Sequence, residues 1–395
     1  MAHFAFVSSP APGHVNPTLP LVEELVRRGH RVSYATGPST MDGPVAAGAS
    51  PVVLPSELPP DMASRSDFTA DQLAVTLEYF LADARASFPV LSEHFSADRP
   101  DAVCYDSVTF TGRMLANQLG VQEISLVPTF AENESFSAAQ VYLPPTFDHT
   151  HPRLVAAIQE MGKFAQGHRF LDNPNLMFGY VAPSSVVFIP REFQPSGETF
   201  DERFHFVGPS LSSWQVAQEW SPRSAAPVLL ISLGTVFNVR PEFYRMCIEA
   251  FGDSAWQVVM AVGGLNPESL GPVPGNFEVH ARVPQVAVLR HARVFLSHAG
   301  SNSVMESLYH GVPFVAVPQI PEQRVMARLA EELRVGKTLA ELTVQGLRDA
   351  VAEVESYRPQ VAAMSRTVRA GGGAAKAADV LEKLLANSAR AASDE

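Results

Sequence analysis

Residues 3–36, HFAFVSSPAPGHVNPTLPLVEELVRRGHRVSYAT, show the pattern on which the predicted fold rests. The apolar run HFAFVSS is typical of a short buried strand, and the segment PAPGH ends it. A helix is expected from Asn16-Pro17, an N-cap followed by a proline at the first helical position, to Gly29. RVSYAT is the next strand. This stretch therefore predicts one strand–helix–strand unit.

The same alternation continues along the first half of the chain. The expected strands are PVVLP, AVCYD and EISLV, and the expected helices span 73–91 and 109–119. This alternation predicts a doubly wound, mostly parallel sheet. From Thr129 to about Ala182 an aromatic, Pro-rich stretch interrupts it, and insertions of this kind often line binding clefts. The strand SVVFIP closes the half.

A second α/β half follows a segment rich in Pro, Ser and Gly. Its strands are expected at VLLISLG, WQVVMAV, FEVHARV, RVFLSHAG and VPFVAVP, separated by helices that include residues 301–309. We predict an N-terminal domain at 1–205, a linker at 206–226, a second domain at 227–375 and a terminal helix at 376–395. The predicted fold class is α/β, with two Rossmann-like doubly wound domains facing an interdomain cleft.

Composition excludes several classes of protein. The 395 residues carry 29 Lys and Arg against 41 Asp and Glu, and the net charge of -12 gives no support for binding nucleic acid. The two cysteines belong to no metal or disulfide motif. The first apolar stretch is too short for a signal peptide, and no window approaches the roughly 18–20 apolar residues of a membrane span. A cytoplasmic protein without a membrane span is expected.

Several familiar motifs are absent or misleading. No G-x-G-x-x-G follows a predicted strand, which argues against a dinucleotide-binding dehydrogenase. Residues 336–338, GKT, resemble the end of a phosphate-binding loop, but Glu331 stands where its first glycine is needed, so a helix end leading into a short strand is expected. Residues 148–151, DHTH, have no third metal ligand nearby. No Asp-x-Asp pair is present to hold a metal with a diphosphate.

His14 and Asp106 are the candidate catalytic residues. Both follow predicted strands of the same sheet, at the edge where open α/β sheets bind ligands. If the strands are close, the Asp106 carboxylate can hold the Nδ1 proton of His14 and leave Nε2 as a general base. Two alternatives remain open: His14 can be a turn residue that hydrogen-bonds the helix start, and Asp106 can cap the following helix.

Residues 293–323, RVFLSHAGSNSVMESLYHGVPFVAVPQIPEQ, form the second constellation. A buried strand ends at Ser297-His298, small residues follow, and a helix begins, so backbone amides and the helix dipole create a site for an anion such as a phosphate. A plain strand-to-helix turn explains Gly300 but not the spacing of His298, Ser303 and Glu306. For Glu306 alone, a solvated helix position is the alternative.

The two constellations at this separation resemble the nucleotide-diphosphate-sugar glycosyltransferases of the GT-B fold, specifically the bacterial macrolide and natural-product glycosyltransferases of the UDP-glycosyltransferase superfamily. The resemblance covers essentially the whole chain. It rests on PAPGHVNPTLPLVEELVRRGHRVSYAT and AVCYDSVTF in the first half, and on ISLGT and RVPQVAVLRHARVFLSHAGSNSVMESLYHGVPFVAVPQIPEQ in the second. It implies that His14 takes the proton of the acceptor hydroxyl with Asp106 as its partner, and that the terminal helix packs on the N-terminal domain.

The resemblance also implies where the diphosphate of the donor binds. The ISLGT motif would lie beside it through Ser232, Gly234 and Thr235. The diphosphate oxygens would be held by His298 and by the amides after Gly300, together with Asn302 and Ser303.

The nucleoside and the sugar have their own implied partners. Glu306 would bind the ribose, and Val283 and Gln285 would meet the nucleobase and ribose. Arg282 stands where related enzymes often have an aromatic residue that stacks on the base, and a guanidinium plane can also stack there. Glu322 and Gln323 would hydrogen-bond the hydroxyls of a hexose such as glucose.

The resemblance therefore implies an inverting hexosyltransferase that needs no metal and no cofactor, with UDP-glucose or another nucleotide-diphosphate sugar as co-substrate. Its partners would be that donor and a hydrophobic acceptor such as a macrolide or polyphenol, in antibiotic biosynthesis or resistance, and the enzyme would be a monomer or homodimer. An apolar cleft for the acceptor is expected from aromatic residues, with core packing as the alternative for each: Phe68, Tyr79, Phe80, Phe88, Phe130, Phe136, Tyr142, Phe147, Phe164, Phe170 and Phe178.

Three rival functions remain. A nucleotide-sugar epimerase of the same architecture would turn over a UDP-sugar without an acceptor. An antibiotic glycosyltransferase that uses a dTDP-deoxysugar would differ only in its donor. A non-catalytic protein that keeps the fold is disfavoured, because the His14/Asp106 pair and the donor block are both intact.

Overall fold

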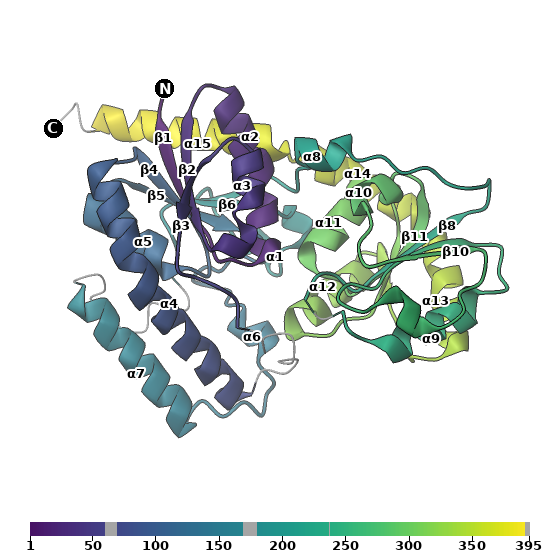
Figure 1. Ribbon diagram of the computed structural model, residues 1–395. Helices are drawn as coiled ribbons and strands as arrows, with labels where there is room; N and C mark the ends of the chain where they lie inside the picture. Colours follow the sequence, from purple (N-terminus) through teal and green to yellow (C-terminus); the bar gives the residue numbers. More distant parts are fainter. Residues whose placement is uncertain (60–68, 169–179, 237, 392–395) are drawn as a thin grey trace. The chain divides into compact units, whose positions relative to one another are not determined.

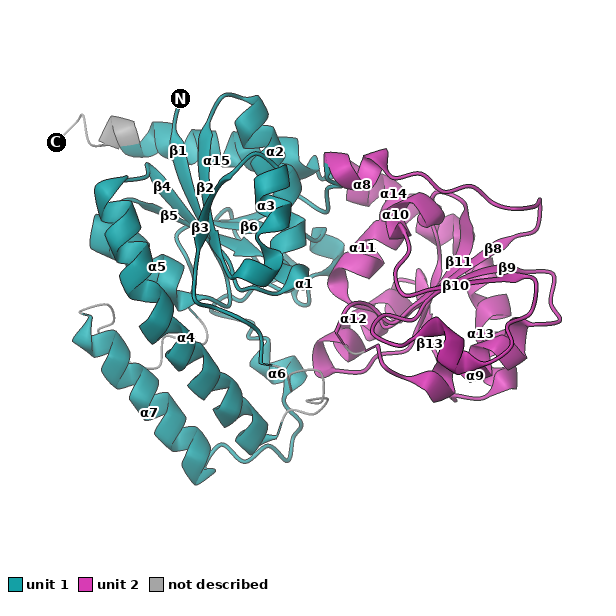
Figure 2. Cartoon of the chain, in the orientation of Figure 1, with its two compact units in different colours: residues 1–212, 371–395 teal, residues 213–370 magenta. Residues whose placement is uncertain are grey.

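A computed structural model describes residues 1–59, 69–168, 180–236 and 238–391. The chain divides into two compact units (Figure 2). Unit 1 comprises residues 1–212 and 371–395, and unit 2 comprises residues 213–370. The first boundary lies inside the segment predicted as a linker, and the second lies just before the predicted terminal helix.

Unit 1 is built on a parallel sheet with the strand order β3-β2-β1-β4-β5-β6-β7 (Figure 1). Its strands are β1 (His3–Val7), β2 (Arg31–Thr36), β3 (Ser50–Val53), β4 (Ala102–Asp106), β5 (Gln122–Val127), β6 (Ser185–Val187) and β7 (Phe204–Phe206). The chain runs outward from β1 to β3 on one side and from β4 to β7 on the other. The point where the order reverses, between β1 and β4, is where sheets of this type bind ligands.

Helices cover both faces of this sheet. The helices of unit 1 are α1 (Pro12–Val15), α2 (Leu19–Arg27), α3 (Asp42–Ala46), α4 (Ala70–Ala97), α5 (Phe110–Leu119), α6 (Ala139–Tyr142), α7 (Pro152–Gly167), which packs on α4, and α15 (Gly373–Ala391). All five residues of β1 are buried, as expected for a strand covered on both sides. Phe4 and Phe6 pack with residues of α2 and α15, whereas Ala5 and Val7 pack with residues of α4 and α5.

The end of the chain is part of unit 1. Leu381 of α15 is fully buried in the core cluster that contains Phe4 and Phe6. Arg28, just after α2, anchors α15, because its guanidinium lies 2.8 Å from Asp379 and 2.7 Å from Glu382 of that helix. Figure 1 shows α15, in yellow, beside α2.

Unit 2 repeats the architecture. Its sheet has the order β10-β9-β8-β11-β12-β13, with strands β8 (Val228–Ser232), β9 (Gln257–Ala261), β10 (Phe277–His280), β11 (Ala292–Ser297), β12 (Phe314–Ala316) and β13 (Gly336–Thr338). Its helices are α8 (Ser213–Ala217), α9 (Pro241–Phe251), α10 (Gln285–Leu289), α11 (Ser301–Tyr309), α12 (Pro321–Glu332), α13 (Val344–Val354) and α14 (Arg358–Ala370). The order reverses between β8 and β11. The predicted class of two doubly wound α/β domains is confirmed.

The start of the first helix differs from the prediction. Asn16 and Pro17 lie in a 3-10 turn (Asn16–Thr18) and not at an N-cap. The chain already turns into α1 after Ala11, whose backbone is extended, because Pro12 supplies the fixed φ of a first helical position. His14 therefore lies on α1, directly after the carboxyl end of β1.

Part of the predicted aromatic cleft is core. The ring of Phe130 lies 6.4 Å from that of Tyr142, and the ring of Phe136 lies 6.3 Å from that of Phe200. Phe130, Phe136 and Phe88 are buried. For these three residues the prediction of a cleft lining is wrong, because the rings fill space between elements of unit 1. Phe68, Phe170 and Phe178 lie outside the described residues.

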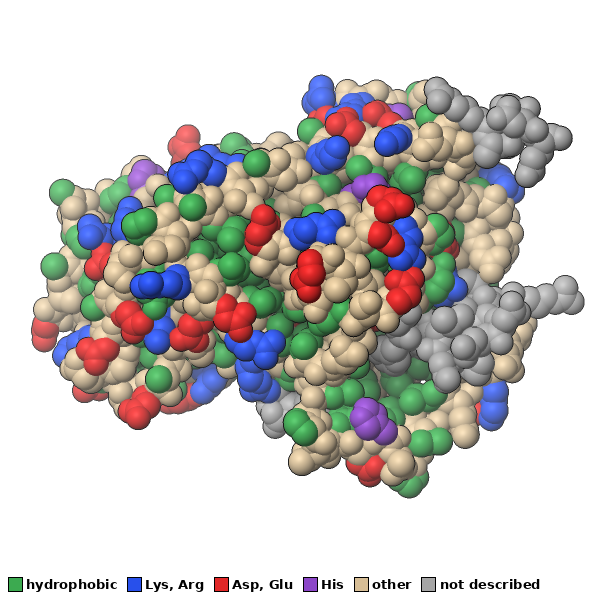
Figure 3. All heavy atoms as spheres, turned by 180° about the vertical axis from the view of Figure 1, so that it is seen from behind, with side chains coloured by type: hydrophobic (Ala, Val, Ile, Leu, Met, Phe, Trp, Pro, Cys, Tyr) green, Lys and Arg blue, Asp and Glu red, His purple; other side chains and the backbone are tan. Residues whose placement is uncertain are grey.

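The surface carries interspersed charges. Figure 3 shows acidic and basic side chains mixed over the face that it draws, with apolar side chains between them. Among the helices that the structure describes, none is long and apolar enough to cross a bilayer.

Candidate functional site

The side chains of His14 and Asp106 meet at the switch point of unit 1. The residues follow β1 and end β4, which are neighbours in the sheet, with Val7 opposite Tyr105. The His14 Nδ1 atom lies 3.0 Å from Asp106 Oδ1 and 2.9 Å from Oδ2. The His14 side chain is 27% exposed and that of Asp106 only 3%, so the imidazole can reach a ligand while the carboxylate is shielded.

The Asp106 carboxylate is turned toward His14 and does not cap the next helix. The N-cap residue of α5 is Thr109, which binds the Asp106 backbone carbonyl through its amide and its hydroxyl. The carboxylate instead accepts hydrogen bonds from the amides of Ser9 and Val108, each at 3.3 Å. The alternative that the sequence left open for Asp106, a cap of the following helix, is therefore excluded.

This geometry fixes what the imidazole can do. An ionised carboxylate only accepts hydrogen bonds, so Nδ1 of His14 carries the proton that bonds Asp106. The Nε2 atom of a neutral His14 then has a lone pair that can accept a proton. A histidine oriented in this way is suited to act as a general base.

In unit 2, a second group of predicted residues surrounds His298. Strands β8 and β11 are neighbours, and Ser232 lies opposite Ser297 at their carboxyl ends. The His298 ring fits between two glycines: a Cβ on Gly234 would lie 2.5 Å from its Cε1 atom, and a Cβ on Gly300 would lie 2.4 Å from Nε2. Only glycine leaves room for the ring at both positions. Gly234 also has a φ of +80°, which other residues adopt at a cost.

His298 is held as a neutral imidazole. Burial lowers its pKa to about 4, because the cation is disfavoured away from water. Its Nδ1 atom is buried and has no hydrogen-bond partner within the part of the chain that the structure describes. A buried polar atom without a partner is costly, so this ring is suited to bind a polar ligand.

The amino end of α11 starts directly after His298. Gly300 is the N-cap residue, and as a glycine it has no side chain to cap the helix. The first amide groups of a helix have no partner within the helix and carry its positive dipole end, so they attract anions. Ala299, just before, has a φ of +63° although it is not glycine, and such strain is often found at functional sites.

Glu306 is the centre of a hydrogen-bonded group on α11. Its Oε2 atom accepts a hydrogen bond of 2.7 Å from Gln285, and its Oε1 atom accepts one of 2.8 Å from Gln215. Gln285 also lies 3.3 Å from the Ser303 hydroxyl. Burial raises the pKa of Glu306, and the two glutamine hydrogen bonds counteract that shift. The predicted residues Gln285, Ser303 and Glu306 are thus brought together.

The predicted sugar-binding pair begins α12. Gln323 is buried, and its Oε1 atom accepts a hydrogen bond of 2.8 Å from the Gln319 amide. This contact fixes the orientation of the Gln323 amide at the start of α12. Glu322 beside it is half-buried.

Other residues predicted to bind the nucleotide sugar are exposed or half-buried around these groups. Thr235 and Arg282 are exposed, and Val283 is half-buried just before α10. Asn302 lies in the first turn of α11. No hydrogen bond between described residues joins Thr235 or Arg282 to the groups around His298 and Glu306.

Two site residues were missed by the sequence analysis. Gln215 lies on α8, in the segment interpreted as a linker. Asn238 is buried and connects the loop at Gly234 with the loop at Gly264. Its Nδ2 atom donates to the Gly234 carbonyl at 2.8 Å, and its Oδ1 atom accepts from the Gly264 amide at 3.1 Å. Neither residue belongs to a motif, so no signal in one sequence distinguishes them.

The predicted absence of a metal site rests on the sequence. In the described ranges, no three or more His, Cys, Asp or Glu side chains are grouped so that they could hold a metal ion. In the loop DHTH, the Asp148 carboxylate accepts hydrogen bonds from the Thr150 amide and hydroxyl.

Comparison with known proteins adds the family. Residues 213–369 match the family described as UDP-glucoronosyl and UDP-glucosyl transferase. The chain is 38% identical to the NDP-glycosyltransferase YjiC of Bacillus licheniformis over 97% of its own length and 98% of that protein. It is 36% identical to the demethyllactenocin mycarosyltransferase of Streptomyces fradiae, over 98% of this chain and 88% of that one.

A solved structure agrees with these relatives. CalG4, the calicheamicin glycosyltransferase, superimposes with a TM-score of 0.85 at 35% identity, and the match covers 98% of each chain. The chain therefore belongs to the nucleotide-diphosphate-sugar glycosyltransferases of the GT-B fold, in their macrolide and natural-product branch.

Proposed function

We propose that the protein transfers a hexose, glucose above all, from a UDP-sugar to a hydroxyl of a hydrophobic natural product, with inversion and without a metal. The observation that carries this proposal is the contact between His14 Nδ1 and Asp106, at 2.9–3.0 Å, beside the switch point of unit 1. It leaves an imidazole Nε2 atom in position to take a proton at the edge where such sheets bind ligands.

The base acts on the acceptor. The proton of the attacked hydroxyl passes to Nε2 of His14, and Asp106 stabilises the imidazolium that forms. The acceptor oxygen bonds to the anomeric carbon while the bond from that carbon to the diphosphate oxygen breaks. The electron pair of the broken bond leaves with UDP. A single in-line displacement of this kind turns an α-linked donor into a β-glycoside.

The groups around His298 are suited to the leaving diphosphate. Charge develops on its oxygens as the bond breaks, and donors that are already in place stabilise that charge without reorganising. The amides at the start of α11 are such donors, and so is the Nδ1 atom of His298, which has no partner among the described residues. They support a transfer that does not depend on a cation. Glu306 and Gln285 would hold the nucleoside, and Glu322 and Gln323 the sugar.

The acceptor class rests on relatives and on apolar residues of unit 1. One relative is named for a calicheamicin, another for demethyllactenocin. Tyr79, Phe80 and Phe110 line a pocket of unit 1. With a volume of about 10 Å³, this pocket supports contact with one small part of a hydrophobic acceptor.

A second donor class has one specific observation in its favour. The Streptomyces fradiae relative is named a mycarosyltransferase and is 36% identical to this chain. A donor with a sugar other than glucose, such as the dTDP-deoxysugar of the rival function, is therefore to be tested beside UDP-glucose.

The deciding experiment incubates the protein with UDP-glucose and EDTA, with and without a panel of macrolide and phenolic acceptors. Release of UDP that depends on the acceptor, together with a product heavier by one hexose and β-configured by NMR, is the expected result. Isomerisation or hydrolysis of the donor without acceptor favours the epimerase or a hydrolase instead. Reaction with dTDP-sugars alone contradicts the UDP assignment.

A further inference from the structure

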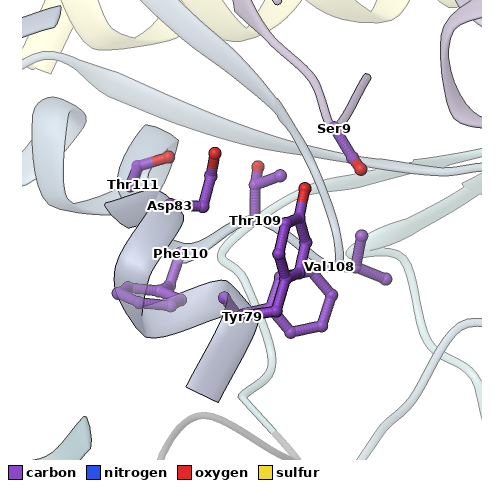
Figure 4. A pocket seen from close by; sticks show the side chains of 8 residues that line it. Ser9, Tyr79, Asp83, Val108, Thr109, Phe110 and Thr111 are labelled. Carbon is purple, nitrogen blue, oxygen red and sulfur yellow. The ribbon is translucent and has the colours of Figure 1, made fainter. Parts of the chain in front are cut away.

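Unit 1 has a small pocket between α4, the start of α5 and the end of β1. It is a cavity of about 10 Å³, which is close to the space that one water molecule needs. Apolar groups of Phe80, Val108 and Phe110 form part of its wall. One side carries side-chain oxygens, those of Ser9, Tyr79, Asp83 and Thr109 (Figure 4).

Among the described residues that line this pocket, Asp83 is the one with an ionisable carboxyl group. It is half-buried on α4, and its carboxylate has no ion pair with any residue that the structure describes. The Ser87 hydroxyl donates a long hydrogen bond, 3.4 Å, to its Oδ1 atom. Burial raises the pKa of Asp83, and the hydroxyls of Ser56 and Ser87 counteract that shift. A carboxylate removed from water without a cation is costly.

Tyr79 stands one helical turn before Asp83 and supplies a second polar group. Its hydroxyl is buried and finds no hydrogen-bond partner among the described residues. The pocket therefore offers a carboxylate and a phenol hydroxyl next to aromatic rings. Oxygens dominate its polar side, so it favours a group that donates several hydrogen bonds.

The pocket is next to the catalytic pair. Ser9 and Val108 both line the pocket, and the amides of these same two residues donate to the Asp106 carboxylate. A ligand in the pocket is thus separated from Asp106 by one backbone segment on each side. An acceptor bound here would therefore lie near the backbone that holds Asp106.

We propose that this pocket selects acceptors that carry a basic nitrogen, with Asp83 pairing the ammonium group and Tyr79 accepting one of its hydrogen bonds. The inference rests on the proposed glycosyl transfer and narrows its acceptor class. An ammonium group matches the size of the cavity and donates three hydrogen bonds. It also neutralises the carboxylate, and a charge-assisted bond in such surroundings is stronger than a neutral one.

The test compares two phenols that differ in charge at one nitrogen, tyramine and N-acetyltyramine, with UDP-glucose as donor. The measured quantity is the ratio of their kcat/KM values. We expect the wild type to prefer tyramine by roughly 10-fold to 100-fold, as for hydrogen bonds to charged groups. In Asp83→Asn this ratio falls to near one, and in Tyr79→Phe it falls to a smaller extent.

The control is Glu93→Gln, which removes one negative charge from the exposed side of the same helix. It should keep the wild-type ratio. Equal ratios in wild type and Asp83→Asn would overturn the proposal.

Binding separates this proposal from the transfer reaction. If the wild type glucosylates neither phenol, the affinities of both phenols for wild type and Asp83→Asn are measured by titration calorimetry. Tighter binding of tyramine that Asp83→Asn abolishes supports the pocket while the proposed reaction fails. Equal binding of the two phenols to wild type contradicts the pocket.

Discussion

The Nδ1 atom of His14 lies 3.0 Å from Asp106 Oδ1, although the two residues are 92 positions apart in the chain. The pairing of β1 with β4 produces this contact, because it aligns the carboxyl ends of the two strands at one edge of the sheet. Two backbone amides then hold the carboxylate in place. The result is a histidine with a defined tautomer, which is what a general base requires.

Replacing His14 by Ala should abolish most turnover and leave donor binding unchanged. A positioned histidine base is typically worth about 10²- to 10⁴-fold in rate. We expect kcat to fall by that amount, while the Kd for UDP, whose proposed partners are in unit 2, stays within about twofold of wild type. Steady-state kinetics and calorimetry check both. A kcat close to that of the wild type would remove His14 from the mechanism.

Replacing Gly300 by Ala should weaken donor binding. The added methyl group would lie 2.4 Å from the His298 ring, so the ring must move. Overpacking of this kind costs about 1–3 kcal/mol, and we expect at least a tenfold higher Kd for UDP. Gly275→Ala is the matched control, because nothing lies within 4 Å of a methyl group there. Equal effects of the two substitutions on the Kd for UDP would contradict a role of His298 in donor binding.

Stability should fall as the pH drops through the range between the unfolded and folded pKa values of two histidines. Burial lowers the pKa of His298 and that of His310 from 6.5 to about 4. Between these pH values the unfolded chain takes up protons that the folded chain excludes, so acid favours unfolding. Urea unfolding across this range should give a steeper loss for wild type than for His310→Gln. Parallel curves would argue against a neutral His310.

Replacing Leu381 by Ala should destabilise unit 1. Leu381 is fully buried in the core that α15 completes, and Leu-to-Ala changes in cores cost about 2–5 kcal/mol. Denaturant unfolding measures this loss, and Lys383→Ala, at an exposed position of the same helix, should have little effect. Comparable stability of the two variants would show that α15 is dispensable for the core.

Replacing Gln215 by Ala should raise the KM for the donor with little change in kcat. Gln215 holds the Glu306 carboxylate, and a hydrogen bond to a charged group is worth about 1.5–3 kcal/mol. If Glu306 binds the donor, its misplacement costs binding more than chemistry. Val216→Ala, at an exposed neighbouring position, is the control. A fall in kcat at constant KM would contradict a positioning role.

Local patterns in the sequence were sufficient for most elements. Helix α11 spans Ser301–Tyr309 as predicted, and Gly336–Thr338 is a short strand after a helix, as expected. In both cases a buried strand and a helix with one apolar face leave a periodicity that neighbours in the chain encode. The start of the first helix was mispredicted, because Pro12 and Pro17 are equally good starting signals and tertiary packing selects between them.

The contacts of individual side chains were harder to predict from the sequence than the helices and strands. Phe130 and Tyr79 are both aromatic residues of the same half, yet Phe130 packs into the core and Tyr79 lines a pocket. Their sequence surroundings do not differ in a way that predicts this, because burial depends on elements distant in the chain. The contacts of Gln215 and Asn238 were not predicted for the same reason, since their partners are distant in the chain.

Local patterns in the chain predict two doubly wound halves and place His14, Asp106 and His298 after strands, since strand ends and turns are encoded by neighbouring residues. Long-range packing is what turns Asp106 toward His14 and away from α5, and what fits His298 between Gly234 and Gly300. A polar side chain has several possible partners of similar strength. Which one it takes depends on the register and spacing of strands that the folded sheet brings together.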